Sequence, residues 1–143
     1  MFDYGELMEE TRPRSVDLSA EQRLVLRQGV LMWGGPASMT DEIARAIWFS
    51  DRDDFYAQRD RLLAAIEEEA PLTPRDWHRV LAATEFGFIS WVLGAGGDWQ
   101  IVSGIDDHDV LTQIRSIQQK LAWVRPWPEP YARPQAVDRE SGS

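Results

Sequence analysis

One carboxylate, Glu85, stands inside a strongly apolar run of the sequence, TEFGFISWVLGAGGDW at residues 84–99. Removing a carboxylate from water costs several kcal/mol unless a cation, an N–H donor or a raised pKa compensates. Glu85 therefore belongs either to a buried structural ion pair or to a site, where it anchors a ligand or acts as an acid or base. Buried polar groups are usually structural, so the ion pair is the first interpretation.

Helical periodicity predicts which residues share the surroundings of Glu85. His78 lies seven residues earlier on nearly the same side of a helix, about 10 Å away along the axis. Arg115 flanks the apolar stripe of a later helix and is the predicted cation partner, while Gln118 within that stripe is a second buried polar candidate. An acid and a tryptophan follow the glycines of the run. The candidate ligand-binding residues are Glu85, His78, Trp99, Asp98 and Arg115.

Other motifs in the sequence do not predict catalysis or a cofactor. The run DDHD at residues 106–109 resembles a metal cluster, but carboxylates at a helix start are favoured by capping and by the helix dipole. The run GAGGDW at 94–99 lacks the preceding strand of a dinucleotide fingerprint and a lysine for phosphate. Nucleophilic catalysis would need Ser90 or Ser103 beside a histidine, and nothing links either serine to one. We predict no catalytic residue, no metal and no cofactor.

Length and charge limit the classes of function. The 143 residues fit one domain, and 43% hydrophobic with 27% charged residues is close to a globular average. The net charge of −9 falls mostly in residues 1–70 and opposes binding to nucleic acid, which depends on Lys and Arg. A basic protein is the better electrostatic match, although the same charge could serve only to keep the protein soluble.

The compartment is also predicted from composition. Without cysteine, the chain has no disulfide framework, thiol nucleophile or thiolate metal site. The first residues, MFDYGELMEE, are acidic where a signal peptide would be basic, and no apolar run approaches the roughly 20 residues that span a bilayer. We predict a cytoplasmic protein that does not enter the membrane.

The elements that position these residues are predicted to be helices. The pattern indicates an all-α domain of about five helices over residues 17–122, with an N-terminal arm at 1–16 and a proline-rich tail at 123–143. A lone extended segment has little to pair with, so we predict no sheet. The central helix is expected at 74–93, because Thr73 is a suitable N-cap followed by proline. The other predicted caps are Ser19, Thr40, Ser50 and Asp106.

Apolar residues at helical spacing predict the core. The central helix should bury Trp77, Val80, Leu81, Thr84, Phe88, Trp91 and Val92. The first, third and last helices should bury Leu24, Val25, Leu31 and Met32; Phe55, Leu62, Leu63 and Ile66; and Val110, Leu111, Ile114, Ile117 and Leu121. Gly29 weakens the first helix. Trp48 also suits the core, whereas Trp99, Trp123 and Trp127 lie in a loop or the tail.

Three segments, LMWGGPA, ATEFGF with GAGGDW, and GIDDHDVLTQIRSIQQKL, resemble small bacterial proteins of uncharacterised activity. The resemblance spans most of residues 24–121 and implies no site residue. Two functions stay open. The first is a non-catalytic, acidic protein-binding module, of the immunity or inhibitor kind, that neutralises a basic partner. The second is a small-ligand-binding protein or enzyme that uses a groove beside the central helix with Glu85. The oligomeric state is left open.

Overall fold

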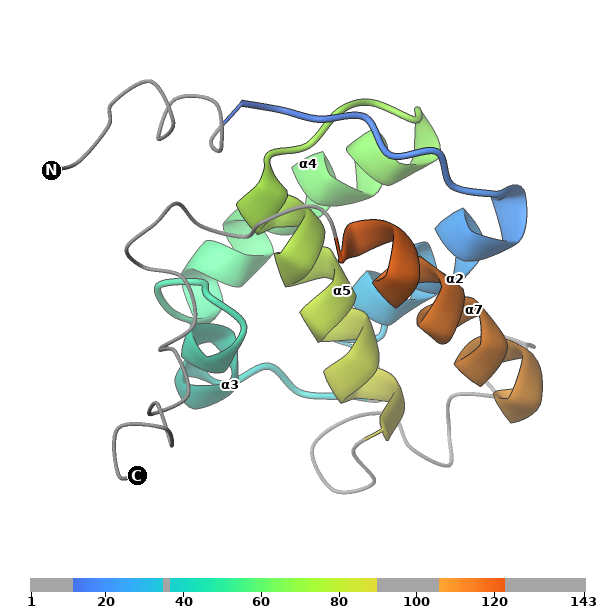
Figure 1. The fold of residues 1–143 in the computed structure, drawn as a ribbon. Helices are drawn as coiled ribbons and strands as arrows, with labels where there is room; N and C mark the ends of the chain where they lie inside the picture. Colours follow the sequence, from blue (N-terminus) through green and yellow to red (C-terminus); the bar gives the residue numbers. More distant parts are fainter. Residues whose placement is uncertain (1–11, 35–36, 90–105, 123–143) are drawn as a thin grey trace, which may run out of the picture.

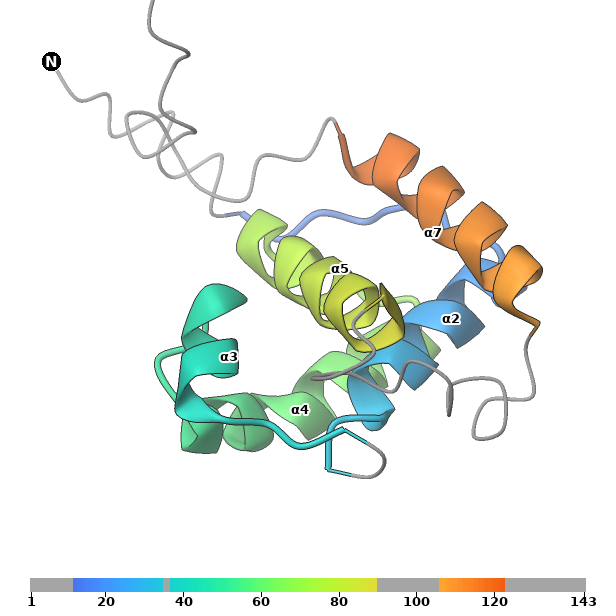
Figure 2. The same cartoon turned by 90° about the horizontal axis from the view of Figure 1, so that it is seen from below.

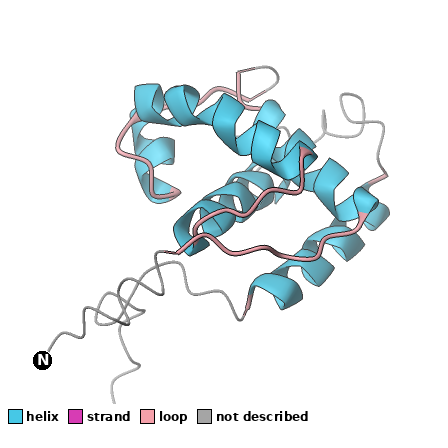
Figure 3. Ribbon diagram, turned by 90° about the horizontal axis from the view of Figure 1, so that it is seen from above, coloured by secondary structure: helices cyan, strands magenta, loops and turns pink. Residues whose placement is uncertain are grey.

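The five described helices surround a shared apolar core in the computed structural model, which describes residues 12–34, 37–89 and 106–122 (Figure 1). In these residues the chain forms no strand, so the predicted all-α fold is confirmed (Figure 3). No helix in the described ranges is long and apolar enough to cross a membrane. The helices are α2 (Ala20–Leu31), α3 (Asp41–Ala46), α4 (Arg52–Glu67), α5 (Pro74–Ile89) and α7 (Asp107–Leu121).

Side-chain caps mark the starts of four of the described helices, and three of these caps are the predicted residues. Ser19 and Gln22 form a reciprocal capping box at the start of α2, because each side chain accepts a hydrogen bond from the other's backbone N–H. Thr40 caps α3 by accepting from the N–H three residues later. Thr73 does the same for α5, with Asp76 N–H donating to its hydroxyl at 3.2 Å. These starts agree with the sequence prediction because capping is a local interaction.

The cap of α4 was predicted one residue too early. Asp51, not Ser50, is the N-cap, and its carboxylate accepts from the N–H of Asp54 at 2.8 Å. Ser50 instead donates its own N–H to the Asp54 carboxylate at 2.9 Å. The two aspartates thus satisfy backbone groups at this helix start, which leaves no capping role for the serine. Asp106 is the N-cap of α7 as predicted, but its side chain accepts no capping hydrogen bond.

The core lies where α2 meets the other helices. Helix α2 packs against α4, α5 and α7, and α5 runs antiparallel to α7 (Figures 1 and 2). The described part of the predicted α5 face is buried as expected, whereas Trp91 and Val92 lie outside the described residues. Leu24 and Leu111 were predicted to be buried but are exposed, and Leu31 and Leu63 are half-buried. The buried positions of α7 are Val110, Ile114, Ile117 and Leu121, and Leu111 stands about 100° away from that stripe.

Gly29 allows α2 and α5 to cross at close range. A Cβ atom at this position would lie 2.5 Å from Cβ and 2.6 Å from Cα of Thr84 on α5, which is far inside van der Waals contact. Thr84 is fully buried, and its hydroxyl donates to the carbonyl of Val80 at 2.9 Å. The glycine that weakens the helix in isolation is therefore required where the two helices touch.

Trp33, at the end of α2, is the tryptophan that fills the centre of the molecule. It is fully buried, and its indole N–H donates to the carbonyl of Ala83 at 3.1 Å. Trp48 was expected in the core but is exposed, because it follows the end of α3 in a left-handed conformation with φ of 70°. Trp77 is buried as predicted.

Residues 12–18 form a strap that crosses the connection between α4 and α5 (Figure 1). Arg14 and Leu72 exchange backbone hydrogen bonds of 2.8 and 3.2 Å. The indole N–H of Trp77 donates to the Arg14 carbonyl at 2.8 Å, and Leu18 is buried. The remainder of the predicted arm, residues 1–11, and the predicted tail at 123–143 lie outside the described residues.

Candidate functional site

Glu85 is held by a neutral side chain on the neighbouring helix. It is half-buried on α5, and one carboxylate oxygen accepts a hydrogen bond of 2.8 Å from the Gln118 amide on α7. The predicted partner, Arg115, is exposed on α7, and the described residues contain no ion pair between it and Glu85. A half-exposed carboxylate keeps contact with water and needs no cation. The amide of Gln118, which lies opposite Glu85, is therefore a sufficient partner where an arginine was predicted.

This hydrogen bond shows how the two helices are aligned. Because α5 and α7 are antiparallel (Figure 2), the end of α5 at Ile89, one turn after Glu85, lies toward the part of α7 that precedes Gln118. Leu111 is seven residues before Gln118 and points within about 20° of it on the helix. We call the surface formed by Glu85, Ile89, Asp107, Leu111 and Arg115 the α5–α7 face.

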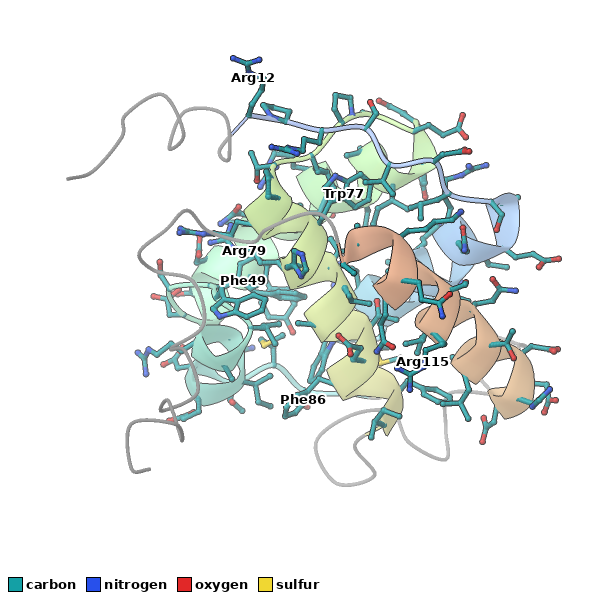
Figure 4. The ribbon with its side chains drawn as sticks, in the orientation of Figure 1. Arg12, Phe49, Trp77, Arg79, Phe86 and Arg115 are labelled. Carbon is teal, nitrogen blue, oxygen red and sulfur yellow. The ribbon has the colours of Figure 1, made fainter. Side chains whose placement is uncertain are left out.

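Apolar side chains are unusually exposed on the α5–α7 face. Ile89 exposes 65% of its surface and Leu111 exposes 49%. Asp107, one turn before Leu111, is exposed, and no described cation pairs with it. The face therefore combines two apolar side chains with carboxylates, and Arg115 is its one cation (Figure 4).

The other predicted site residues are not assembled around Glu85 by the described structure. His78 lies two turns earlier on α5 and is half-buried. Asp98 and Trp99 lie outside the described residues, so their proximity to Glu85 stays a prediction. In the part of the chain that is described, no group of three acidic or histidine side chains is placed to hold a metal ion.

Asp76 is the most deeply buried charge in the described chain, and its burial was not predicted from the sequence. Its carboxylate is paired with Arg61 at 2.9 Å and with Arg79 at 3.0 Å. Arg79 also donates twice to the Trp48 carbonyl, at 2.9 and 2.7 Å, and its guanidinium lies 4.7 Å from the ring centre of Phe49 (Figure 4). The spacing of Asp76 and Arg79 is the one signal in the sequence, since i and i+3 share a helix side. This network ties α5 to α3 and α4 and is structural.

Part of the acidic charge near α2 and α4 is also compensated within the fold. Arg27 pairs with Glu67, and Arg23 pairs with Glu69. These carboxylates come from the EEE run at the unfavourable end of α4, so the arginines of α2 offset the helix dipole there. The carboxylates at the start of α7 have no such partner among the described residues, and they lie beside the exposed Leu111, which makes that end of the molecule a candidate for an acidic contact surface.

Asp54 is the described carboxylate whose ionisation is most clearly tied to the fold. The backbone N–H of Ser50 donates to it and lowers the pKa of Asp54 below its ordinary value of 3.8. The amide of Gln58 donates to its other oxygen at 2.7 Å and lowers the pKa further, while burial opposes both effects. This carboxylate therefore stabilises the junction of α3 and α4 in its charged form.

A cavity of about 510 Å³ lies beside the first half of α4, away from the residues predicted to form a site. Two of its side chains are arginines and one is a tyrosine, all on α4. The sequence shows their helical spacing, but the turn after α2 that completes the cavity meets α4 only in the folded chain. The lining residues are Gly34, Ser38, Met39, Arg52, Tyr56 and Arg59.

Comparison of the chain with protein-family models, with curated proteins and with solved structures finds no match.

Proposed function

We propose that this chain is a non-catalytic module that binds a basic protein, in the manner of a bacterial immunity or inhibitor protein, through the α5–α7 face. The observation that supports the proposal is the exposure of Ile89 and Leu111, at 65% and 49%, on the side of two adjacent helices that carries Glu85. Exposed apolar side chains within a polar rim are typical of a protein contact surface.

The negative charge of this region indicates that the partner is positively charged. Asp106, Asp107 and Asp109 are exposed at the start of α7, and the whole chain carries a net charge of −9. Such a surface attracts a basic protein over long range and accelerates encounter at low salt. The proposal includes a cytoplasmic setting, to which a chain without cysteine is suited because it requires no disulfide.

The proposal is tested by affinity capture from the organism that encodes the chain, at low and at raised salt. Leu111→Ser should abolish capture of a basic protein, because it removes an apolar contact from the α5–α7 face. Leu24→Ser is the matched control, since Leu24 is 44% exposed but lies on α2 outside that face. Raised salt should weaken capture by the unaltered chain. Equal capture by the two variants would show that the face is not the contact surface.

A second candidate, binding or conversion of a small ligand at Glu85, is favoured by one detail. The described residues donate to only one of the two carboxylate oxygens of Glu85, so the other is available to a ligand. Glu85→Gln distinguishes the two functions. It should leave protein capture nearly intact under the first proposal, because an uncharged amide can also accept from Gln118. The second function would be favoured if Glu85→Gln no longer bound a small ligand found by screening, and if neither the variant nor the unaltered chain captured a protein.

A further inference from the structure

The cavity beside α4 is locally basic in a strongly acidic chain. Its arginines, Arg52 and Arg59, flank Tyr56 at helical spacing of four and three residues on one side of α4. Their guanidinium carbons lie 5.7 and 5.6 Å from the centre of the tyrosine ring, within the range of cation–π contact. Two like charges are thus held against the same ring.

Neither guanidinium is neutralised by a described carboxylate. The ion pairs of the described residues involve other arginines, and Arg59 directs one N–H to the carbonyl of Trp33 at 3.0 Å. Asp41 lies near Arg52, but its carboxylate accepts from the backbone N–H of that residue at 3.0 Å. A guanidinium carries five N–H donors, so most donors of both arginines stay available.

Two polar side chains of α4 lie close to Gly34 in the wall of the cavity. The φ of Gly34 is +103°, and a Cβ atom there would lie 3.2 Å from Nη1 of Arg59 and 3.3 Å from the hydroxyl of Tyr56. Two hydrogen-bond donors from α4 therefore meet at the turn after α2, where a side chain would crowd them. Ser38 adds a hydroxyl to the same lining.

We propose that this cavity binds the phosphate group of a small phosphate monoester. Arg52 and Arg59 supply the positive charge for a dianion, and the forked guanidinium donors match phosphate oxygens in geometry. Tyr56 and Ser38 supply neutral donors. The volume of about 510 Å³ lies in the range of small-molecule sites, and the net charge of −9 disfavours a long polyanion such as nucleic acid. This site is independent of the α5–α7 face.

The experiment is isothermal titration calorimetry of the full chain at low salt, with phenyl phosphate, inorganic phosphate and succinate as probes. Phenyl phosphate should bind saturably and more tightly than the other two. Arg52→Gln should weaken its binding by about tenfold or more, as expected for loss of a charged hydrogen bond. Arg52 is exposed and its side chain contacts the face of Tyr56, so the variant should unfold at the same temperature as the unaltered chain.

Arg75→Gln is the matched control, because it removes the same charge from an exposed position on α5. It should leave binding within about twofold, since a distant surface charge is screened. The proposal is overturned if neither phosphate compound binds, or if the two arginine variants weaken binding equally. Tighter binding of inorganic phosphate would exclude the monoester, and tighter binding of succinate would exclude phosphate chemistry.

Discussion

Replacement of Gly29 by alanine has opposite expected effects on helix propensity and on the packing of α2 against α5. In an isolated helix the change is favourable by about 1 kcal/mol, because alanine has the higher helix propensity. In the folded chain the new Cβ would lie 2.5 Å from Cβ and 2.6 Å from Cα of Thr84. A backbone atom cannot move aside by rotation, so α2 and α5 must separate by about 1 Å to restore normal contact.

The expected loss of stability follows from the packing contacts that this separation weakens. A radial gap of 0.5–1 Å forfeits about a quarter to a half of each affected dispersion contact, and α2 and α5 share fully buried residues on both sides of the crossing. Overpacking of this kind costs about 3 kcal/mol or somewhat more when backbone must shift. After subtraction of the propensity gain, we expect Gly29→Ala to lose about 2–3 kcal/mol of unfolding free energy. In a chain of 143 residues that lowers the Tm by about 5–12 °C.

Gly87→Ala provides the matched control on the partner helix. A Cβ atom there would meet the sulfur of Met32 and lie 3.3 and 3.4 Å from its Cγ and Cε. A methionine side chain can adopt another rotamer, so we expect a change within about 1 kcal/mol. Urea unfolding followed by far-UV circular dichroism measures both variants. If Gly29→Ala is neutral or stabilising, α2 and α5 do not cross at Gly29 and the reasoning is refuted.

Three further predictions concern polar groups. Asp76→Ala should lose about 3–5 kcal/mol in urea unfolding, because it leaves Arg79, whose side chain is only 14% exposed, without its carboxylate, whereas Arg61→Ala should lose less than about 1 kcal/mol since its side chain is 51% exposed; equal losses would contradict this network. A double-mutant cycle of Glu85→Ala and Gln118→Ala should give a coupling of about 0.5–1.5 kcal/mol, and additive losses would exclude their hydrogen bond. The folded-state pKa of Asp54 is lowered, so its carboxylate stabilises the fold above its unfolded pKa and this contribution is lost as pH falls through the folded value. Acid unfolding should therefore be less steep in Asp54→Asn, and identical acid limbs in circular dichroism would contradict this assignment.

The helices were predictable because their signals are local. Ser19, Thr40 and Thr73 act on backbone groups within three residues, so the sequence contains both partners of each interaction. The one misplaced cap arose where two capable residues are adjacent. Asp54 distinguishes them, because its N–H donates to the carboxylate of Asp51 while its own carboxylate accepts from the N–H of Ser50.

The polar contacts between helices were less predictable, because they depend on how the helices align. Arg115 and Gln118 lie on the same side of α7, and only the antiparallel register with α5 decides which of them meets Glu85. The burial of Trp33 likewise follows from the approach of α5, which supplies the Ala83 carbonyl for its N–H. The cavity combines α4 with a turn that precedes α3, so no single segment of sequence contains it.

The central position of α2 affects when this helix can fold relative to the synthesis of the helices around it. This helix is translated before the helices it packs against, yet Gln22 donates to Ser116 and accepts from Lys120, residues translated more than 90 positions later. The strap at residues 12–18 likewise cannot form its hydrogen bonds until Leu72 and Trp77 have been synthesised. The apolar side of α2 thus stays without its final partners until α7 has emerged, and loop closure over this sequence separation slows the last step. A nascent chain stalled before α7 would expose that surface to chaperones and proteases, and we expect the described helices to fold as one unit only once α7 is available.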